Sequence, residues 1–115
     1  MSIPDTPLFV KTHDLIVWLL QHTQRFPKGL RQSYTSRLED AAFDFQKATL
    51  MANAARGAVR REWLDQADGY LLCLRALLRF VPDLRLLGAH QLRYAIEHVD
   101  ELGRLLGAWK KGTDR

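Results

Sequence analysis

Four histidines are the side chains in this sequence best suited to bind a transition metal, and they stand at positions 13, 22, 90 and 98. Two imidazoles share one metal on a helical face when they are about four residues apart, and no pair here has that spacing. The sequence also contains no Glu-x-x-His pair, which di-iron sites in four-helix bundles require. We therefore expect no metal site and no cofactor.

The single cysteine, Cys73, is the only candidate thiol nucleophile, and apolar residues surround it in the sequence. A thiol in such a setting is usually a small, unreactive core residue. One cysteine allows no intramolecular disulfide, which fits a reducing cytoplasm. The sequence has no Gly-x-Ser-x-Gly motif and no Walker-type glycine-rich loop, so we expect no catalytic residues and no enzymatic activity.

The basic residues offer a different chemistry, which is the binding of phosphate. The chain has a formal net charge of +4, and its 17 basic residues comprise 12 Arg and 5 Lys. A guanidinium group grips phosphate with two parallel hydrogen bonds and stacks on bases. Clusters near the predicted helix ends are the candidate nucleic-acid-binding residues, namely Lys28, Arg31, Arg56, Arg60, Arg61, Arg79, Lys110 and Lys111. An ordinary solvated basic surface remains the alternative.

Helix-breaking residues divide the 115-residue chain into four long segments within a single domain, residues 1–115. Pro7 suits a first helical turn, whereas Pro27, Gly57 and Pro82 mark interruptions. The hydrophobic content of 47% is enough for one continuous core. We predict helices at about residues 6–26, 31–55, 59–80 and 89–111.

Apolar residues recur at spacings of three and four in the last three segments, so each helix presents one apolar stripe. Short connections favour antiparallel neighbours, and the predicted fold is therefore an all-α, antiparallel up-down-up-down four-helix bundle. The stripes are Tyr34, Leu38, Ala41, Phe45, Ala48 and Ala52; Leu64, Ala67, Leu71, Leu74, Leu78 and Val81; and Leu92, Ala95, Val99, Leu102, Leu106 and Trp109.

The first predicted helix is apolar on every side over residues 15–20, which one core cannot cover. This run is far shorter than the roughly 20 residues of a membrane span, so we expect no membrane contact. The surplus apolar surface favours an oligomer, with Val17 and Trp18 as candidate interface residues. The alternative is a helix buried within its own bundle.

A charged stripe accompanies the apolar stripe of the third helix, and it contains Arg61, Asp65, Asp68, Arg75 and Arg79. Intrahelical pairs such as Arg61 with Asp65 contribute only about 0.3–0.5 kcal/mol, and a solvated face is the simpler interpretation. Asp68 and Arg75 flank core leucines, so they are expected to meet charges from another helix, with Arg37 as a candidate.

Several short motifs occur together in one order. They are Phe26-Pro27-Lys28, Arg37-Leu38, Ala67-Asp68, Leu74-Arg75-x-Leu77-Leu78-Arg79 and Leu102-Gly103-Arg104-Leu105-Leu106-Gly107-Ala108-Trp109. This order resembles the four-helix-bundle family that contains the accessory variability determinant (Avd) of diversity-generating retroelements and the proteins encoded in 23S ribosomal RNA intervening sequences. The resemblance spans residues 9–111.

This resemblance implies a homopentameric barrel with a basic, funnel-like centre. In the retroelement branch, such a barrel binds RNA and DNA without strong sequence specificity, and also binds the reverse transcriptase of the element. It supports the error-prone copying of template RNA into cDNA during mutagenic retrohoming. Acidic residues that lie off the predicted core stripe are the candidate contacts with the basic polymerase, namely Glu39, Asp40 and Asp44.

Two other function classes stay open at this point. The first is a structural or protein-interaction bundle of the 23S rRNA intervening-sequence type, with incidental basic charge and no polymerase partner. The second is a cryptic enzyme or metalloprotein, which the missing ligands and nucleophiles disfavour.

Overall fold

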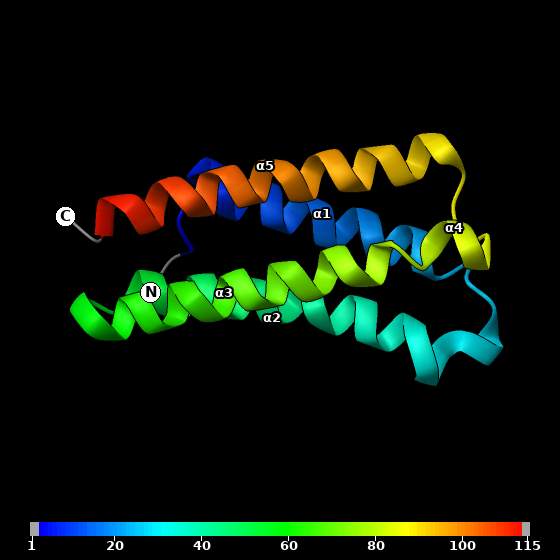
Figure 1. The fold of residues 1–115 in the computed structure, drawn as a ribbon, viewed down its shortest axis with the longest axis horizontal. Helices are drawn as coiled ribbons and strands as arrows, with labels where there is room; N and C mark the ends of the chain where they lie inside the picture. Colours follow the sequence, from blue (N-terminus) through cyan, green and yellow to red (C-terminus); the bar gives the residue numbers. More distant parts are fainter. Residues whose placement is uncertain (1–2, 114–115) are drawn as a thin grey trace.

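The computed structural model describes residues 3–113, which contain helices and no strand (Figure 1). The four-helix, all-α fold class predicted from the sequence is thereby confirmed. Four long helices carry the architecture, and three short segments connect them. The long helices are α1 (Pro7–Thr23), α2 (Ser36–Ala54), α3 (Gly57–Leu78) and α5 (Ala89–Thr113). The short segments are the 3₁₀-helix η1 (Lys28–Leu30), the π-helix η2 (Arg31–Thr35) and α4 (Val81–Leu84).

The long helices lie side by side along a molecule 44 Å long and 25 × 24 Å across. Helix α1 packs against α2 and α5, and α3 packs against the same two helices. Consecutive long helices are joined at alternate ends of the bundle, as Figure 1 shows by the colour sequence. Each helix therefore has one face toward a shared core, two flanks against neighbours and one outer face.

The apolar stripes predicted from the sequence line this core. Every stripe residue of α2 and α3 is buried, and so are Ala95, Val99, Leu102 and Leu106 of α5. Leu92 and Trp109, at the two ends of the α5 stripe, are half-buried against the same cluster. Full burial of one Leu or Phe side chain contributes roughly 1.5–3 kcal/mol, so these stripes are the main source of stability.

The helix boundaries differ from the prediction mainly at the end of the bundle that holds the connections after α1 and α3. Helix α1 stops at Thr23, and the next helix opens with one π-helical turn before α2 begins. After α3, the predicted interruption at Pro82 is itself the first turn of α4, because proline fits that position without losing a hydrogen bond. Arg85 ends α4 in the left-handed conformation, at φ 54°.

Cys73 and the membrane-spanning potential of the helices are both the subject of predictions from the sequence. Cys73 is exposed, so its predicted place in the core is wrong: Leu71 and Leu74 face the core from α3, and Cys73 points away from it. None of the described helices is both long and apolar enough to cross a membrane.

Tyr34 fastens the π-helical turn to the end of α3. Its hydroxyl donates a hydrogen bond to the carbonyl of Leu77, and its ring packs 6.0 Å from that of Phe80. Burial raises the pKa of Tyr34 from 10.0 to about 12, because ionisation in the apolar environment is unfavourable. The neutral, hydrogen-bonded phenol is therefore part of the native structure.

We predict that Tyr34→Phe costs about 1 kcal/mol near neutral pH and removes much of the stability loss at alkaline pH. The folded-state pKa lies above the ordinary value, so the stability linked to Tyr34 is complete below pH 10 and is lost as the pH rises through about 12. Urea unfolding from pH 7 to 11.5 measures this difference. Tyr70→Phe is the control, since the Tyr70 hydroxyl makes no hydrogen bond within residues 3–113. Parallel curves for wild type and Tyr34→Phe would contradict the prediction.

Candidate nucleic-acid interface

The eight basic residues predicted to bind nucleic acid fall at opposite ends of the bundle. One group lies where α2 ends, α3 begins and α5 ends, at the left of Figure 1. We call it the basic end, and it comprises Arg56, Arg60, Arg61, Lys110 and Lys111. Lys28, Arg31 and Arg79 lie at the other end, near the connections after α1 and α3. The 44 Å length of the molecule prevents both groups from contacting one short stretch of phosphates.

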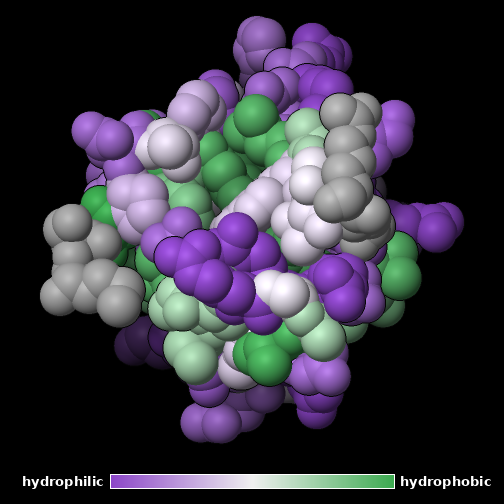
Figure 2. Space-filling view, turned by 90° about the vertical axis from the view of Figure 1, so that its left-hand side faces the viewer, coloured by the Kyte–Doolittle hydropathy of each residue, from purple (hydrophilic) through white to green (hydrophobic). Residues whose placement is uncertain are grey.

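The turn between α2 and α3 places the first residues of the basic end. Ala55 and Arg56 are extended, and Gly57 follows with a φ of +57°, which a residue with a Cβ rarely adopts. Figure 2 looks onto this end and shows hydrophilic residues spread around it, with hydrophobic groups between them. Arg56, Arg61 and Lys111 are exposed, and within residues 3–113 none of the three has an ion-pair partner.

Arg60 is mainly a structural residue at this end. Its Nε donates to the carbonyls of Ala52 and Ala55, both at 2.9 Å, and its Nη2 donates to Asn53 at 3.3 Å. The guanidinium also lies 5.8 Å from the ring centroid of Trp109. Arg60 therefore caps the C-terminal end of α2 and joins α2 to α5.

Lys110 is likewise engaged within the protomer. Its Nζ lies 3.0 Å from a carboxylate oxygen of Asp65 and also pairs with Asp68, so α5 is tied to α3. Hydrogen bonds to Asp68 and Asp65 raise the pKa of Lys110 above its ordinary value. Its charge is matched locally, so it is a weaker candidate for phosphate binding than Arg56, Arg61 and Lys111.

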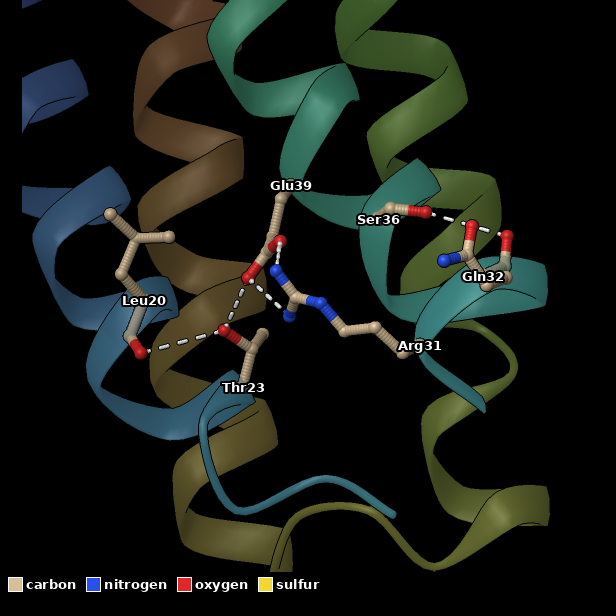
Figure 3. Close-up of polar contacts among 6 residues, drawn as sticks. All are labelled: Leu20, Thr23, Arg31, Gln32, Ser36 and Glu39. Atoms are coloured by element: carbon tan, nitrogen blue, oxygen red, sulfur yellow. Dashed lines mark hydrogen bonds and ion pairs between the residues drawn. The ribbon is translucent and has the colours of Figure 1, made fainter. Parts of the chain in front are cut away.

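At the opposite end, Arg31 belongs to a small polar network (Figure 3). Its guanidinium lies 3.0 Å from Glu39, which also accepts a 2.7 Å hydrogen bond from the hydroxyl of Thr23. This network links the end of α1, the π-helical turn and the first turn of α2. Lys28 and Arg79 are exposed, and Arg79 lines an apolar depression between α3 and α5.

The predicted position of Glu39 on an open helical face is wrong. Its side chain is buried, because the helix turns it toward α1, where Thr23 and Arg31 satisfy the carboxylate. Removing Arg31 would leave the buried carboxylate without its compensating charge, and Thr23 would then be its remaining partner. Asp40 is exposed and Asp44 half-buried, so these two remain candidate contacts for a partner.

The two candidate interface residues of α1 point in different directions. Val17 faces outward and is 40% exposed. Trp18 is half-buried and turns toward α5, with its ring centroid 4.0 Å from that of His22 and 5.0 Å from that of Tyr94. The apolar run of α1 is thus covered largely within the protomer, and of its residues 15–20 only Val17 is exposed.

The charged stripe of α3 pairs with α5 rather than α2. Arg75 forms an ion pair with Asp100, and Asp68 pairs with Lys110, so the suggested role of Arg37 is wrong. Arg61 and Asp65 do not pair, since Asp65 is turned to Lys110.

Within residues 3–113, no group of three or more His, Cys, Asp and Glu side chains is arranged to hold a metal ion.

Comparison with models of known protein families identifies the family of this chain. A family model described as bAvd-like matches residues 8–113. The chain belongs to the bAvd-like family. The match confirms the resemblance to the Avd family, and the chain is an Avd-type accessory protein at the level of the family. No significant match is found among curated proteins.

We predict that the bAvd-like chain with Arg60→Ala loses about 2 kcal/mol of unfolding free energy, because charged hydrogen bonds to three carbonyls at the end of α2 and just after it disappear. Arg61→Ala, its exposed neighbour, is the matched control and should change stability by less than about 0.5 kcal/mol. Chemical denaturation of both variants measures the contrast. Equal stability of the two would show that the Arg60 cap contributes little.

Proposed function

We propose that this bAvd-like chain is the basic, non-enzymatic accessory protein of a diversity-generating retroelement. In this role it binds nucleic acid through the basic end and assists the reverse transcriptase of the element. The proposal rests on the family match over residues 8–113 together with Arg56, Arg61 and Lys111, exposed cations at one end of the bundle that have no ion-pair partner among the described residues 3–113.

The proposed assembly is a homopentameric ring of antiparallel, up-down-up-down protomers. The joining of consecutive long helices at alternate ends supports this protomer topology (Figure 1). In a ring whose axis follows the helices, every protomer presents its basic end on the same rim. Potentials from repeated charges add, and such a rim attracts phosphate backbones without reading their sequence.

The reverse transcriptase and its template RNA are the proposed partners. A basic polymerase is not attracted by the net charge of +4, so its contact needs local acidic or apolar surface. Asp40 and Asp44 supply carboxylates on α2, whereas Glu39 is committed to Thr23 and Arg31. The second candidate function is a structural bundle of the intervening-sequence type, favoured by the internal pairing of Arg31, Arg60 and Lys110.

We predict broad binding to RNA and DNA, with an affinity that falls steeply as salt concentration rises. Each lost phosphate contact should reduce the log–log salt slope by about 0.9 on duplex DNA or 0.7 on single strands. The variant Arg56→Ala/Arg61→Ala/Lys111→Ala should therefore bind more weakly and with a smaller salt slope. Fluorescence anisotropy at several salt concentrations between about 50 and 300 mM measures both quantities.

The matched control is Lys28→Ala/Arg79→Ala/Arg85→Ala, which removes the same number of exposed cations from the opposite end. It should retain most of the affinity. Equal losses in the two triple variants would contradict the basic end as the binding site. Binding that is insensitive to salt or strictly sequence-specific would contradict the proposed mode of recognition.

We predict that the chain co-purifies with a reverse transcriptase encoded beside its gene, and that Asp44→Lys weakens this complex by charge repulsion. Arg37→Asp, at an exposed position of the same helix outside both contacts, is the control of opposite sign and should not weaken the polymerase contact. Light scattering of each variant separates loss of the polymerase from loss of self-assembly. An unchanged complex with Asp44→Lys would remove this carboxylate from the contact, and absence of any polymerase partner would favour the structural bundle.

A further inference from the structure

The outer face of α2 carries an ordered set of three exposed side chains, Asp40, Phe43 and Lys47. They are separated by three and four residues, so they form one row over two helical turns, about 10 Å long. Phe43 is 43% exposed, and within residues 3–113 neither Asp40 nor Lys47 has an ion-pair partner. From the N-terminal to the C-terminal end of α2, the side chains of this row are acidic, aromatic and basic.

A second row lies on the flank of α3 that faces outward beside α5. It consists of Arg75, Leu72 and Asp68, again separated by three and four residues. Leu72 is 67% exposed, the most exposed apolar side chain of the four long helices. Beside it lies a shallow depression of about 480 Å³, lined by Asp68, Gly69, Leu71, Leu72, Arg75 and Gly103. From its C-terminal to its N-terminal residue, this row is basic, then apolar, then acidic.

The two rows match in charge order and in spacing. We propose that a second copy of this chain docks its α2 row on the α3 row, with Asp40 against Arg75, Phe43 beside Leu72 in the depression, and Lys47 against Asp68. In each row the two charges are seven positions apart, with the apolar side chain three residues from one charge and four from the other. Helices aligned in opposite directions therefore bring all three pairs into register at once.

The direction of the helices makes this contact compatible with rotational symmetry. Helices α2 and α3 run in opposite directions within one protomer (Figure 1). When two protomers stand parallel, α2 of one copy is therefore antiparallel to α3 of the next, as the register demands. Because the two rows are different faces of the chain, the contact is head-to-tail and repeats from copy to copy until a ring closes.

The internal ion pairs of the α3 row leave room for these contacts. Arg75 and Asp68 are both near half-exposed although they pair with Asp100 and Lys110. A guanidinium has five N–H donors and a carboxylate about four acceptor positions, so each group can serve an internal and an intersubunit partner together. Gly69 has no heavy atom within 4 Å of where a Cβ would stand, so this part of the face is open to an incoming ring.

This inference rests on the proposed ring and deepens it, since it identifies the faces that meet. It also assigns Asp40 to self-assembly, which leaves Asp44 as the acidic candidate for the polymerase. The contact lies on the sides of the bundle, so the basic end stays free for nucleic acid.

The first test is Phe43→Glu, with the mass measured by light scattering and by sedimentation over a range of micromolar concentrations. We expect a wild-type mass near five protomers and, for the variant, a dissociation constant raised by at least about a hundredfold. Val59→Glu is the matched control, because Val59 is an exposed apolar residue at the start of α3, away from both rows. Far-UV circular dichroism and thermal unfolding check that each variant is folded.

The second test is a charge-exchange cycle at the Lys47–Asp68 contact. Lys47→Asp and Asp68→Lys should each weaken assembly by about tenfold, because like charges then face each other, and the double variant should recover most of the loss. Lys110 keeps Asp65 as a partner when Asp68 is changed, so the protomer remains tied together.

The outcomes separate the inference from the function on which it rests. A wild-type oligomer that persists in Phe43→Glu, or charge variants whose effects are purely additive, would overturn the proposed faces and leave the proposed ring intact. A wild-type monomer at micromolar concentration would overturn both the ring and the faces. Dissociation by Phe43→Glu together with recovery in the double variant would establish the contact.

Discussion

Burial of four apolar stripes in one shared core is the constraint on which the rest of this structure depends. Once Leu38, Phe45, Leu64 and Leu102 face inward, the 3.6-residue period fixes which residues face outward on every helix. The row on the outer face of α2 and the row on the flank of α3 are consequences of this packing. The core also sets the length of the bundle and thereby holds the two groups of basic residues apart. Every surface with a functional interpretation is thus placed by side chains that never reach solvent.

This dependence explains which features the sequence predicts well. Core stripes repeat within one helix, so local periodicity is enough to find them, and the stripe from Leu64 to Leu78 of α3, which continues to Val81 of α4, is buried throughout. Residues at the edge of a stripe are harder to assign. Glu39 follows Leu38 directly, and only the approach of Thr23 and Arg31 turns it from an apparent surface carboxylate into a buried one. Those partners come from α1 and from a π-helical turn, whose geometry no local pattern in the sequence indicates.

For the basic residues too, the sequence indicates where the cations lie, whereas packing determines which of them have partners within the protomer. Sequence clusters correctly place Arg56, Arg60 and Arg61 near one turn, but they do not distinguish cations that serve the fold from cations that are available to a ligand. Arg60 completes the hydrogen bonds of α2, and Lys110 is held by Asp65 and Asp68. The charged stripe of α3 contains the two acidic partners of Lys110, so the sequence indicates that a cation from another helix pairs there. The hydrogen bonds of Arg60 depend instead on where α2 ends, which the sequence indicates less well. Pairing, more than the net charge of +4, determines which of these cations are free to serve the proposed phosphate binding.

The division of roles between the sides and the ends of the bundle follows from the same geometry. Helix ends bring together residues from three different helices, so a compact cluster of cations arises where α2, α3 and α5 meet. Helix sides instead offer long, regular rows, which suit recognition of another helix with matching spacing. The proposed contact through the sides would leave the ends open, and parallel copies would then repeat the basic end around one axis. Because phosphates repeat along a nucleic-acid chain, a cluster of cations repeated around the proposed ring would engage several of them at once, and each protomer would add to an affinity that one exposed arginine could not supply.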